Sequence, residues 1–201
     1  MTRQWLRERK RDYYHRLAIE EGYRSRAAYK LLQIADRHHF IKEGDVVLDL
    51  GAAPGGWMQA VLTLVGDKGY ILGVDLKPIE SFKEVNVSSI VADIEKLSPS
   101  DLLRRLPRRP DVLLSDLSPN LSGVWNVDHA RQMDLAKSSL RLANGILKLG
   151  GNMVVKVFQG EFFKTYLEEI REAFERIRVI KPKASRKESA EMYILGFGFR
   201  G

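Results

Sequence analysis

Five short apolar runs recur along the chain with helical stretches among them, and this alternation constrains the fold more than any other feature. The apolar runs are VVLDL (46–50), YILGVDL (70–76), SSIVAD (88–93), DVLLSDL (111–117) and NMVVKVF (152–158). Stretches with helical periodicity lie at 57–65, 100–106, 127–147 and 162–174. Continuous apolar strands separated by helices are typical of a mainly parallel sheet covered on both faces. The pattern therefore predicts a doubly wound α/β domain.

Two further apolar segments follow, IRVIKP (177–182) and MYILGFGF (192–199). The connection between them is too short for a helical crossover, so we expect them to pair antiparallel at one edge of the sheet. The complete pattern predicts a Rossmann-like sheet of seven strands, mostly parallel, with one antiparallel edge strand.

Residues up to about position 40 have a helical pattern of their own. Gly22 is expected to stop a first helix, and Ser25 is expected to cap a second one. The second helix would carry four apolar residues on one side: Ala28, Leu31, Leu32 and Ala35. We expect residues 1–40 to form a basic helical extension of a single domain that spans residues 1–201.

Positive charge is concentrated at the two ends of the chain. The formal net charge is +7, and residues 1–30 hold nine Lys or Arg against four Asp or Glu, while residues 171–201 hold eight against four. Basic ends around a near-neutral centre indicate binding of a polyanion such as a nucleic acid. The chain has no cysteine, no long apolar stretch and no apolar signal-peptide core, which predicts a cytoplasmic location without membrane association.

The first predicted strand runs into the turn DLGAAPGGW, at the edge of the sheet where ligands bind in such folds. Gly51 allows a tight turn, and Gly55 and Gly56 let the backbone approach a ligand. Asp75 and Asp93 close the next two strands, where they would accept hydrogen bonds from ribose hydroxyls and from an adenine amino group. The spacing differs from G-x-G-x-x-G, so the set indicates a nucleoside-bearing cofactor and favours S-adenosylmethionine over NAD.

Lys156 interrupts an otherwise apolar strand, and a buried ammonium group is costly unless it is paired. Asp116 ends the preceding strand at the same edge of the predicted sheet. Glu191 begins the last strand, and the antiparallel direction of that strand brings its start to this edge too. The order of the elements therefore predicts that Asp116, Lys156 and Glu191 converge.

Five motifs that follow one another along nearly the whole chain are SRAAYKL, DLGAAPGGW, SDLSPNLSG, VVKVFQG and SRKESAEMY. They resemble the successive motifs of the FtsJ/RrmJ (RlmE) family of S-adenosylmethionine-dependent RNA ribose 2′-O-methyltransferases. The resemblance implies a class I methyltransferase fold, with S-adenosylmethionine as methyl donor and S-adenosylhomocysteine as product. It implies a uridine ribose of large-subunit (23S-type) ribosomal RNA, free or within the large ribosomal subunit, as the substrate. Leu117 stands where bacterial members tend to have methionine, and both residues are apolar.

The resemblance also assigns functional residues. The catalytic set of the family falls on Lys30, Asp116, Lys156 and Glu191. The cofactor contacts of the family fall on Gly55, Trp57, Asp75, Asp93 and Asp116. Lys30 is assigned by the resemblance alone, because a lysine in an N-terminal helix is otherwise expected to be solvated.

The chemistry explains why lysines and carboxylates would gather. Methyl transfer to a ribose is an in-line displacement, and the 2′-hydroxyl is a poor nucleophile until its proton is withdrawn. A lysine acts as a base only in its neutral form, which nearby carboxylates oppose, so the carboxylates are expected to orient the lysines. We expect Lys156 to accept or steer the proton, Asp116 to position Lys156, and Lys30 and Glu191 to hold the ribose.

Three other interpretations fit parts of the sequence. The same motifs also serve methylation of tRNA, and a non-catalytic RNA-binding protein of ribosome assembly could use the basic ends alone. An NAD-linked oxidoreductase is disfavoured because the G-x-G-x-x-G spacing is missing. We expect no metal site, because no ligand spacing links the four histidines: His15, His38, His39 and His129. A monomer is the favoured oligomeric state.

Overall fold

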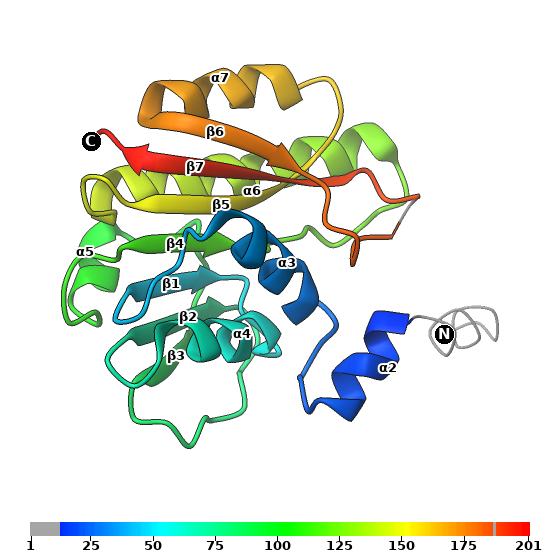
Figure 1. The fold of residues 1–201 in the computed structure, drawn as a ribbon. Coiled ribbons are helices and arrows are strands. Elements are labelled where there is room, and N and C mark those ends of the chain that lie inside the picture. The colour runs from blue at the N-terminus through cyan, green and yellow to red at the C-terminus, as the bar shows by residue number, and fades with distance from the viewer. Residues whose placement is uncertain (1–12, 187) are drawn as a thin grey trace.

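The computed structural model describes residues 13–186 and 188–201, which contain one seven-stranded sheet with helices packed on both faces (Figure 1). The strands are β1 (Val46–Leu50), β2 (Tyr70–Asp75), β3 (Val87–Val91), β4 (Val112–Ser115), β5 (Asn152–Phe158), β6 (Phe174–Ile180) and β7 (Glu191–Phe199). The helices are α2 (Tyr13–Glu20), α3 (Ala28–His38), α4 (Gly56–Val65), α5 (Pro99–Leu103), α6 (Trp125–Ile146) and α7 (Phe163–Ala173).

The strand order is β3-β2-β1-β4-β5-β7-β6, and the pairings from β3 to β5 are all parallel. β7 runs antiparallel to both of its neighbours and lies between β5 and β6, one place in from the edge (Figure 1). The predicted doubly wound sheet with an antiparallel pair at one side is confirmed. Strand order reverses between β1 and β4, so the crevice beyond their carboxyl ends is the expected ligand site.

Two apolar clusters cover the two faces of the sheet. One joins α5, α6 and α7 to side chains such as Leu48 and Val155, and the other joins α3 and α4 to side chains such as Val47 and Val154. Neighbouring residues of one strand therefore point into opposite clusters, and both clusters are closed to water. This explains why β1, β4 and β5 read as nearly continuous apolar runs in the sequence.

The entry to α3 differs from the prediction. Ser25 does not cap this helix, because the N-cap position is Ala27 and no side chain caps it. The backbone carbonyl of Ser25 instead accepts a hydrogen bond from the amide of Ala28 at 3.2 Å, which closes a turn before the helix begins. The Ser25 side chain packs against Gly56 of α4, where a Cβ atom would lie 2.2 Å from the Ser25 hydroxyl oxygen. The side chain that the local pattern assigned to capping therefore packs the turn before α3 against α4.

Part of the predicted basic extension lies outside the described residues, since these begin at Tyr13. The described part of the extension comprises α2, α3 and the loop between them, and the ring of Tyr29 in α3 contacts Tyr14 of α2 and Tyr23 of the loop. Within the described residues, no helix is both long and apolar enough to cross a lipid bilayer.

Gly196 of β7 provides a test of the packing beside β6. A Cβ atom at Gly196 would lie 2.6 Å from the ring of Phe174, so Gly196→Ala is expected to lower the free energy of unfolding by about 1–3 kcal/mol. Chemical denaturation measures this loss. The double variant Gly196→Ala/Phe174→Leu is expected to lose less than the two single variants together, because the smaller side chain leaves room. Strictly additive losses would contradict the proposed contact.

Candidate active site

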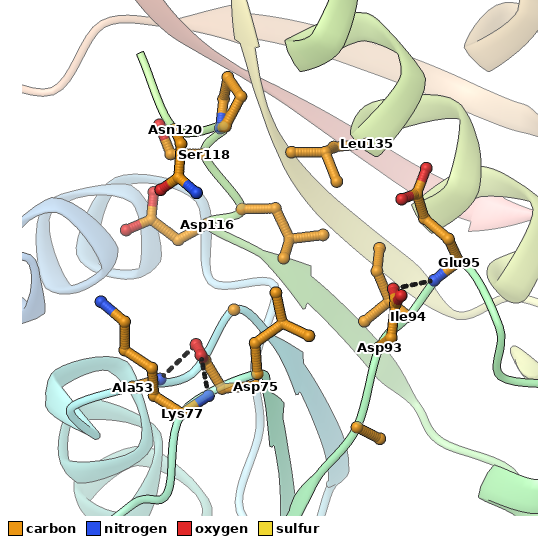
Figure 2. Close-up of a pocket in the computed structure, with 15 residues that line it drawn as sticks. Ala53, Asp75, Lys77, Asp93, Ile94, Glu95, Asp116, Ser118, Asn120 and Leu135 are labelled. Carbon is orange, nitrogen blue, oxygen red and sulfur yellow. Dashed lines mark hydrogen bonds between the residues drawn. The ribbon is translucent and has the colours of Figure 1, made fainter. Parts of the chain in front are cut away.

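A cavity of about 460 Å³ opens beyond the carboxyl ends of the central strands. Asp75, Asp93 and Asp116 line it, and they come from the ends of β2, β3 and β4 (Figure 2). A volume of this size lies in the range of roughly 300–1,000 Å³ that is typical of small-molecule sites. The predicted gathering of acidic side chains at this edge is therefore present in the structure.

Asp75 is held in place by the backbone of two different loops. Its Oδ2 accepts from the amide of Ala53 and its Oδ1 from the amide of Lys77, both at 2.9 Å (Figure 2). The first bond ties the end of β2 to the glycine-rich turn after β1. Each carboxylate oxygen has a further lone pair, so Asp75 retains acceptor capacity toward the cavity.

Asp93 lies two residues beyond β3, on the other side of the cavity from Asp75 (Figure 2). Its Oδ1 accepts from the amide of Glu95 at 3.0 Å, and its Oδ2 lies 3.5 Å from Nζ of the exposed Lys96. The hydrogen bond from Glu95 closes a local turn and fixes the direction of the Asp93 carboxylate.

Gly55 and Trp57, the other two predicted cofactor contacts, do not line this cavity. Trp57 is buried, donates from Nε1 to the carbonyl of Ala27 at 2.8 Å, and packs on Tyr193 with ring centroids 5.8 Å apart. Gly55 has φ of 109°, and a Cβ atom there would lie 2.8 Å from the guanidinium of Arg24. Their role as cofactor contacts stays a prediction.

Asp116 connects the cavity to the predicted catalytic lysines. Its Oδ1 accepts from the hydroxyl of Tyr193 at 2.7 Å and lies 3.2 Å from Nζ of Lys156. Lys156 also donates to the backbone carbonyl of Asp116 at 2.9 Å. The Lys156 residue is only 5% exposed, so this double contact compensates for the loss of water around its ammonium group.

Lys30 and Glu191 form the second half of the same group. Nζ of Lys30 lies 2.7 Å from Oε1 of Glu191 and donates to the hydroxyl of Tyr193 at 3.3 Å. Oε1 of Glu191 also accepts from the hydroxyl of Ser185 at 2.9 Å. A continuous chain of contacts therefore runs from Glu191 through Lys30 and Tyr193 to Asp116, and all four predicted catalytic residues belong to one cluster.

Strand register explains why these side chains meet. Lys156 pairs with Tyr193 and Phe158 pairs with Glu191 across the antiparallel β5–β7 ladder. Glu191 and Tyr193 are two residues apart, so they point to the same face of the sheet as Lys156. Sequence reasoning assigned no role to Tyr193. The period-two spacing from Glu191 was the available signal, but the cross-strand register was needed to use it.

The cluster shifts the ionisation of its members. Burial opposes ionisation of Asp116, but the positive charges of Lys156 and Lys30 and the bond from Tyr193 outweigh it and hold the pKa of Asp116 below its usual value. Burial, followed by the negative charges of Asp116 and Glu191, raises the pKa of Tyr193 well above its usual range. Asp116 is therefore an anion at neutral pH, and Tyr193 is a neutral hydrogen-bond donor.

Asp49 is a buried carboxyl beside this cluster that the sequence analysis did not single out. It is the last residue but one of β1, is fully buried, and neither side-chain oxygen has a hydrogen-bond partner among the described residues. Burial, followed by the negative charges of Asp116 and Asp75, raises the pKa of Asp49 well above its usual value. Asp49 thus has a different protonation preference from Asp116, one strand away.

No group of three or more potential metal ligands comes together within residues 13–186 and 188–201. His129 is buried and stacks between Trp125 and Phe162, and its Nε2 accepts from the amide of Phe162 at 3.1 Å. This histidine therefore packs among aromatic rings.

A sequence model of FtsJ-like methyltransferases matches residues 23–199. The chain belongs to the FtsJ-like methyltransferase family. The matched region of this methyltransferase begins before Lys30 and ends after Glu191, so it includes the cavity and the whole Lys–Asp–Tyr–Glu cluster.

Individual relatives agree with this assignment. The FtsJ-like methyltransferase is 47% identical over 203 residues to "Ribosomal RNA large subunit methyltransferase E" of Methanococcus maripaludis strain C5. The alignment covers 99% of this chain and 78% of the relative. A structure described as a ribosomal RNA methyltransferase from Plasmodium falciparum superposes with a TM-score of 0.78 at 28% identity, over 89% of this chain and 100% of that one. Aeropyrum pernix fibrillarin, whose structure contains natively bound S-adenosyl-L-methionine, shares the fold, with a TM-score of 0.58 at 19% identity over 87% and 75% of the chains.

Asp49→Asn is expected to stabilise the ligand-free methyltransferase at neutral pH. A carboxyl whose pKa is raised by folding costs stability as the pH rises above its unfolded pKa of about 4, because only the unfolded chain ionises readily. The asparagine variant avoids this cost, so its free energy of unfolding should exceed that of the wild type by on the order of 1 kcal/mol or more at pH 7. Denaturation between pH 3 and 8 measures the gain, which should vanish below about pH 4. A gain that is independent of pH would contradict the explanation.

Tyr193→Phe removes the hydroxyl that links Lys30 to Asp116 but keeps the ring that packs on Trp57. We expect kcat for methyl transfer to fall roughly tenfold or more, because the two halves of the cluster lose their shared contact. Tyr70→Phe is the matched control, since it also removes one hydroxyl, at the opposite end of the sheet. Equal turnover of the two variants would show that the Tyr193 hydroxyl has no part in positioning.

Proposed function

We propose that this FtsJ-like methyltransferase transfers a methyl group from S-adenosylmethionine to the 2′-hydroxyl of a uridine ribose in large-subunit ribosomal RNA. The observation that carries the proposal is the double role of Asp116. It lines the large cavity, and it contacts both Lys156 and Tyr193. A cofactor in that cavity and a hydroxyl group at the lysine cluster would therefore meet at one carboxylate.

The residues around the cavity fit a nucleoside with a cationic centre. Asp75 and Asp93 would hold the ribose hydroxyls and the adenine amino group of S-adenosylmethionine, because both are hydrogen-bond acceptors fixed by backbone amides. The cofactor would supply an electrophilic methyl group on a sulfonium ion. Four carboxylates and one ammonium group, that of Lys77, line the cavity, and this negative balance favours a positively charged ligand over a dinucleotide with its anionic pyrophosphate.

The protein would act on the attacking hydroxyl by orientation and by removal of its proton. Asp116 holds the Lys156 ammonium through two contacts, so the lysine head group is placed before the substrate arrives. Lys156 would first release one proton to solvent, and its neutral amine would then take the 2′-hydroxyl proton. The 2′-oxygen would form its bond to the methyl carbon as the carbon–sulfur bond breaks and S-adenosylhomocysteine leaves. Lys30 and Glu191, paired at 2.7 Å, would hold the ribose by donating to and accepting from its hydroxyls.

The choice of RNA rests on charge and on the relatives. The chain has a net charge of +7 with basic ends, which suits a polyanionic substrate. The Methanococcus maripaludis relative is described by name as acting on large-subunit ribosomal RNA. We extend that substrate to this chain, and we take residues 1–201 to act as one domain in which the basic residues 1–40 assist RNA binding.

Mapping the methylated ribose tests the proposal directly. Purified enzyme is incubated with methyl-labelled S-adenosylmethionine and, in parallel, with large-subunit RNA, large-subunit particles and a tRNA transcript. We expect label at one 2′-oxygen of a uridine in the large-subunit RNA or particle. Label confined to tRNA would support the tRNA alternative, and binding without any transfer would support a non-catalytic assembly protein.

Lys156→Met tests the role of the buried lysine. We expect kcat to fall by about 10²–10⁴-fold, the usual contribution of a positioned proton acceptor, with little change in cofactor affinity. Single-turnover transfer and calorimetric titration of S-adenosylmethionine separate the two effects. Lys164→Met, on the exposed surface of α7, is the matched control and should keep full activity. Near-normal turnover by a folded Lys156→Met variant would rule out this role.

A further inference from the structure

A second, smaller cavity lies on the other side of the catalytic cluster. Its volume is about 250 Å³, and five residues line it: Arg26, Lys30, Arg186, Ser189 and Glu191. It shares no lining residue with the large cavity. Lys30 lines the small cavity and Asp116 the large one, and the hydroxyl of Tyr193 bridges the two residues.

The lining of the small cavity is strongly cationic. It carries three positive side chains and one carboxylate, and that carboxylate, on Glu191, already contacts Lys30 at 2.7 Å. Arg26 is anchored by the bond from its Nη2 to the carbonyl of Ala184 at 2.6 Å. Burial, followed by repulsion from the positive charge of Arg186, which lines the same cavity, lowers the pKa of Arg26. An anion between them would relieve this repulsion.

The size and chemistry of the small cavity match one phosphate group. Guanidinium groups present several N–H donors in a plane and bind phosphate oxygens in pairs. The hydroxyl of Ser189, which accepts from the amide of Glu191 at 3.2 Å, can donate to the same anion. The cavity is smaller than the range typical of sites for whole nucleosides or drug-sized ligands. It therefore fits a backbone phosphate better than a base.

We propose that Arg26 and Arg186 bind the phosphodiester on the 3′ side of the ribose that is methylated. This inference rests on the proposed function. In RNA the 2′-hydroxyl and the 3′-phosphodiester are attached to adjacent carbons of one ribose, so a site for one lies beside a site for the other. Lys30 belongs to both the catalytic cluster and the small cavity, which gives the required adjacency. The phosphate would fix the sugar, and the base would contribute nothing to this contact.

Arg186→Gln is the first test, because Arg186 is exposed and its loss leaves the anchored Arg26 in place. We expect the dissociation constant for large-subunit RNA to rise about tenfold or more, the effect of losing one charge-assisted hydrogen bond. The slope of log affinity against log salt should become shallower by about 0.7–0.9, equivalent to one phosphate contact. Affinity for S-adenosylmethionine should not change.

Arg105→Gln is the matched control for Arg186→Gln. It removes the same charge from an exposed arginine near the start of β4, at the opposite end of that strand from Asp116. We expect its RNA affinity and salt slope to stay within about twofold of the wild type. Equal losses in the two variants would overturn the proposal, because they would reflect net charge alone.

A chemically altered RNA identifies the phosphate itself. Two RNA fragments that contain the mapped ribose are compared. In the first, an uncharged methylphosphonate replaces the phosphodiester on the 3′ side of that ribose. In the control fragment, it replaces a phosphodiester two nucleotides away. The wild type should lose about tenfold in affinity for the first RNA, and Arg186→Gln should lose little more, because the contact is already gone. If the methylphosphonate and Arg186→Gln lower the RNA affinity additively, the proposal is wrong.

The binding measurements separate this inference from the proposed function. If the wild type transfers methyl groups to ribosomal RNA but Arg186→Gln behaves like Arg105→Gln, only the phosphate site fails. If the wild type transfers no methyl group to RNA yet Arg186→Gln alone loses RNA affinity, the proposed reaction fails and the anion site remains.

Discussion

The contact between Asp116 and the buried Lys156 is the interaction on which the rest of the site depends. Each charge would be costly alone at the covered edge of the sheet, and together they hold the lysine ammonium in one place. Because Asp116 also lines the large cavity, the same carboxylate would set the distance between the proposed cofactor side and the proposed substrate side. Replacing the pair with apolar residues could preserve the fold, but it would remove the junction between the two sides.

The topology supplies the remaining groups of the cluster. β7 lies between β5 and β6 and runs against them, so its first residues reach the same edge as the carboxyl ends of the parallel strands. Tyr193 and Glu191 thereby join Lys156 from the opposite direction. Lys30 approaches from α3, which packs on the same face as α4. The cluster thus draws on elements from both ends of the chain.

Much of this arrangement could be predicted, because apolar alternation determines the sheet and strand ends determine where Asp75, Asp93 and Asp116 lie. The meeting of Lys156, Asp116 and Glu191 followed from strand order alone. Lys30 needed the family resemblance, since nothing in a helical pattern tells a solvated lysine from one aimed at a neighbouring strand. Tyr193 was missed because its role depends on register, and Ser25 was misassigned because packing against Gly56 replaced local capping. Trp57 packs on Tyr193, and its assignment as a cofactor contact stays a prediction.

The position of β7 makes part of the candidate site dependent on strand pairing. The residues that line the large cavity lie between positions 51 and 135, before β5 in the sequence. Tyr193 and Glu191 belong to β7, which lies between β5 and β6 in the sheet. The hydroxyl bridge of Tyr193 and the carboxylate partner of Lys30 therefore take their places only when β7 pairs with β5. Assembly of the whole cluster is thus tied to the pairing of β7 with its two neighbours.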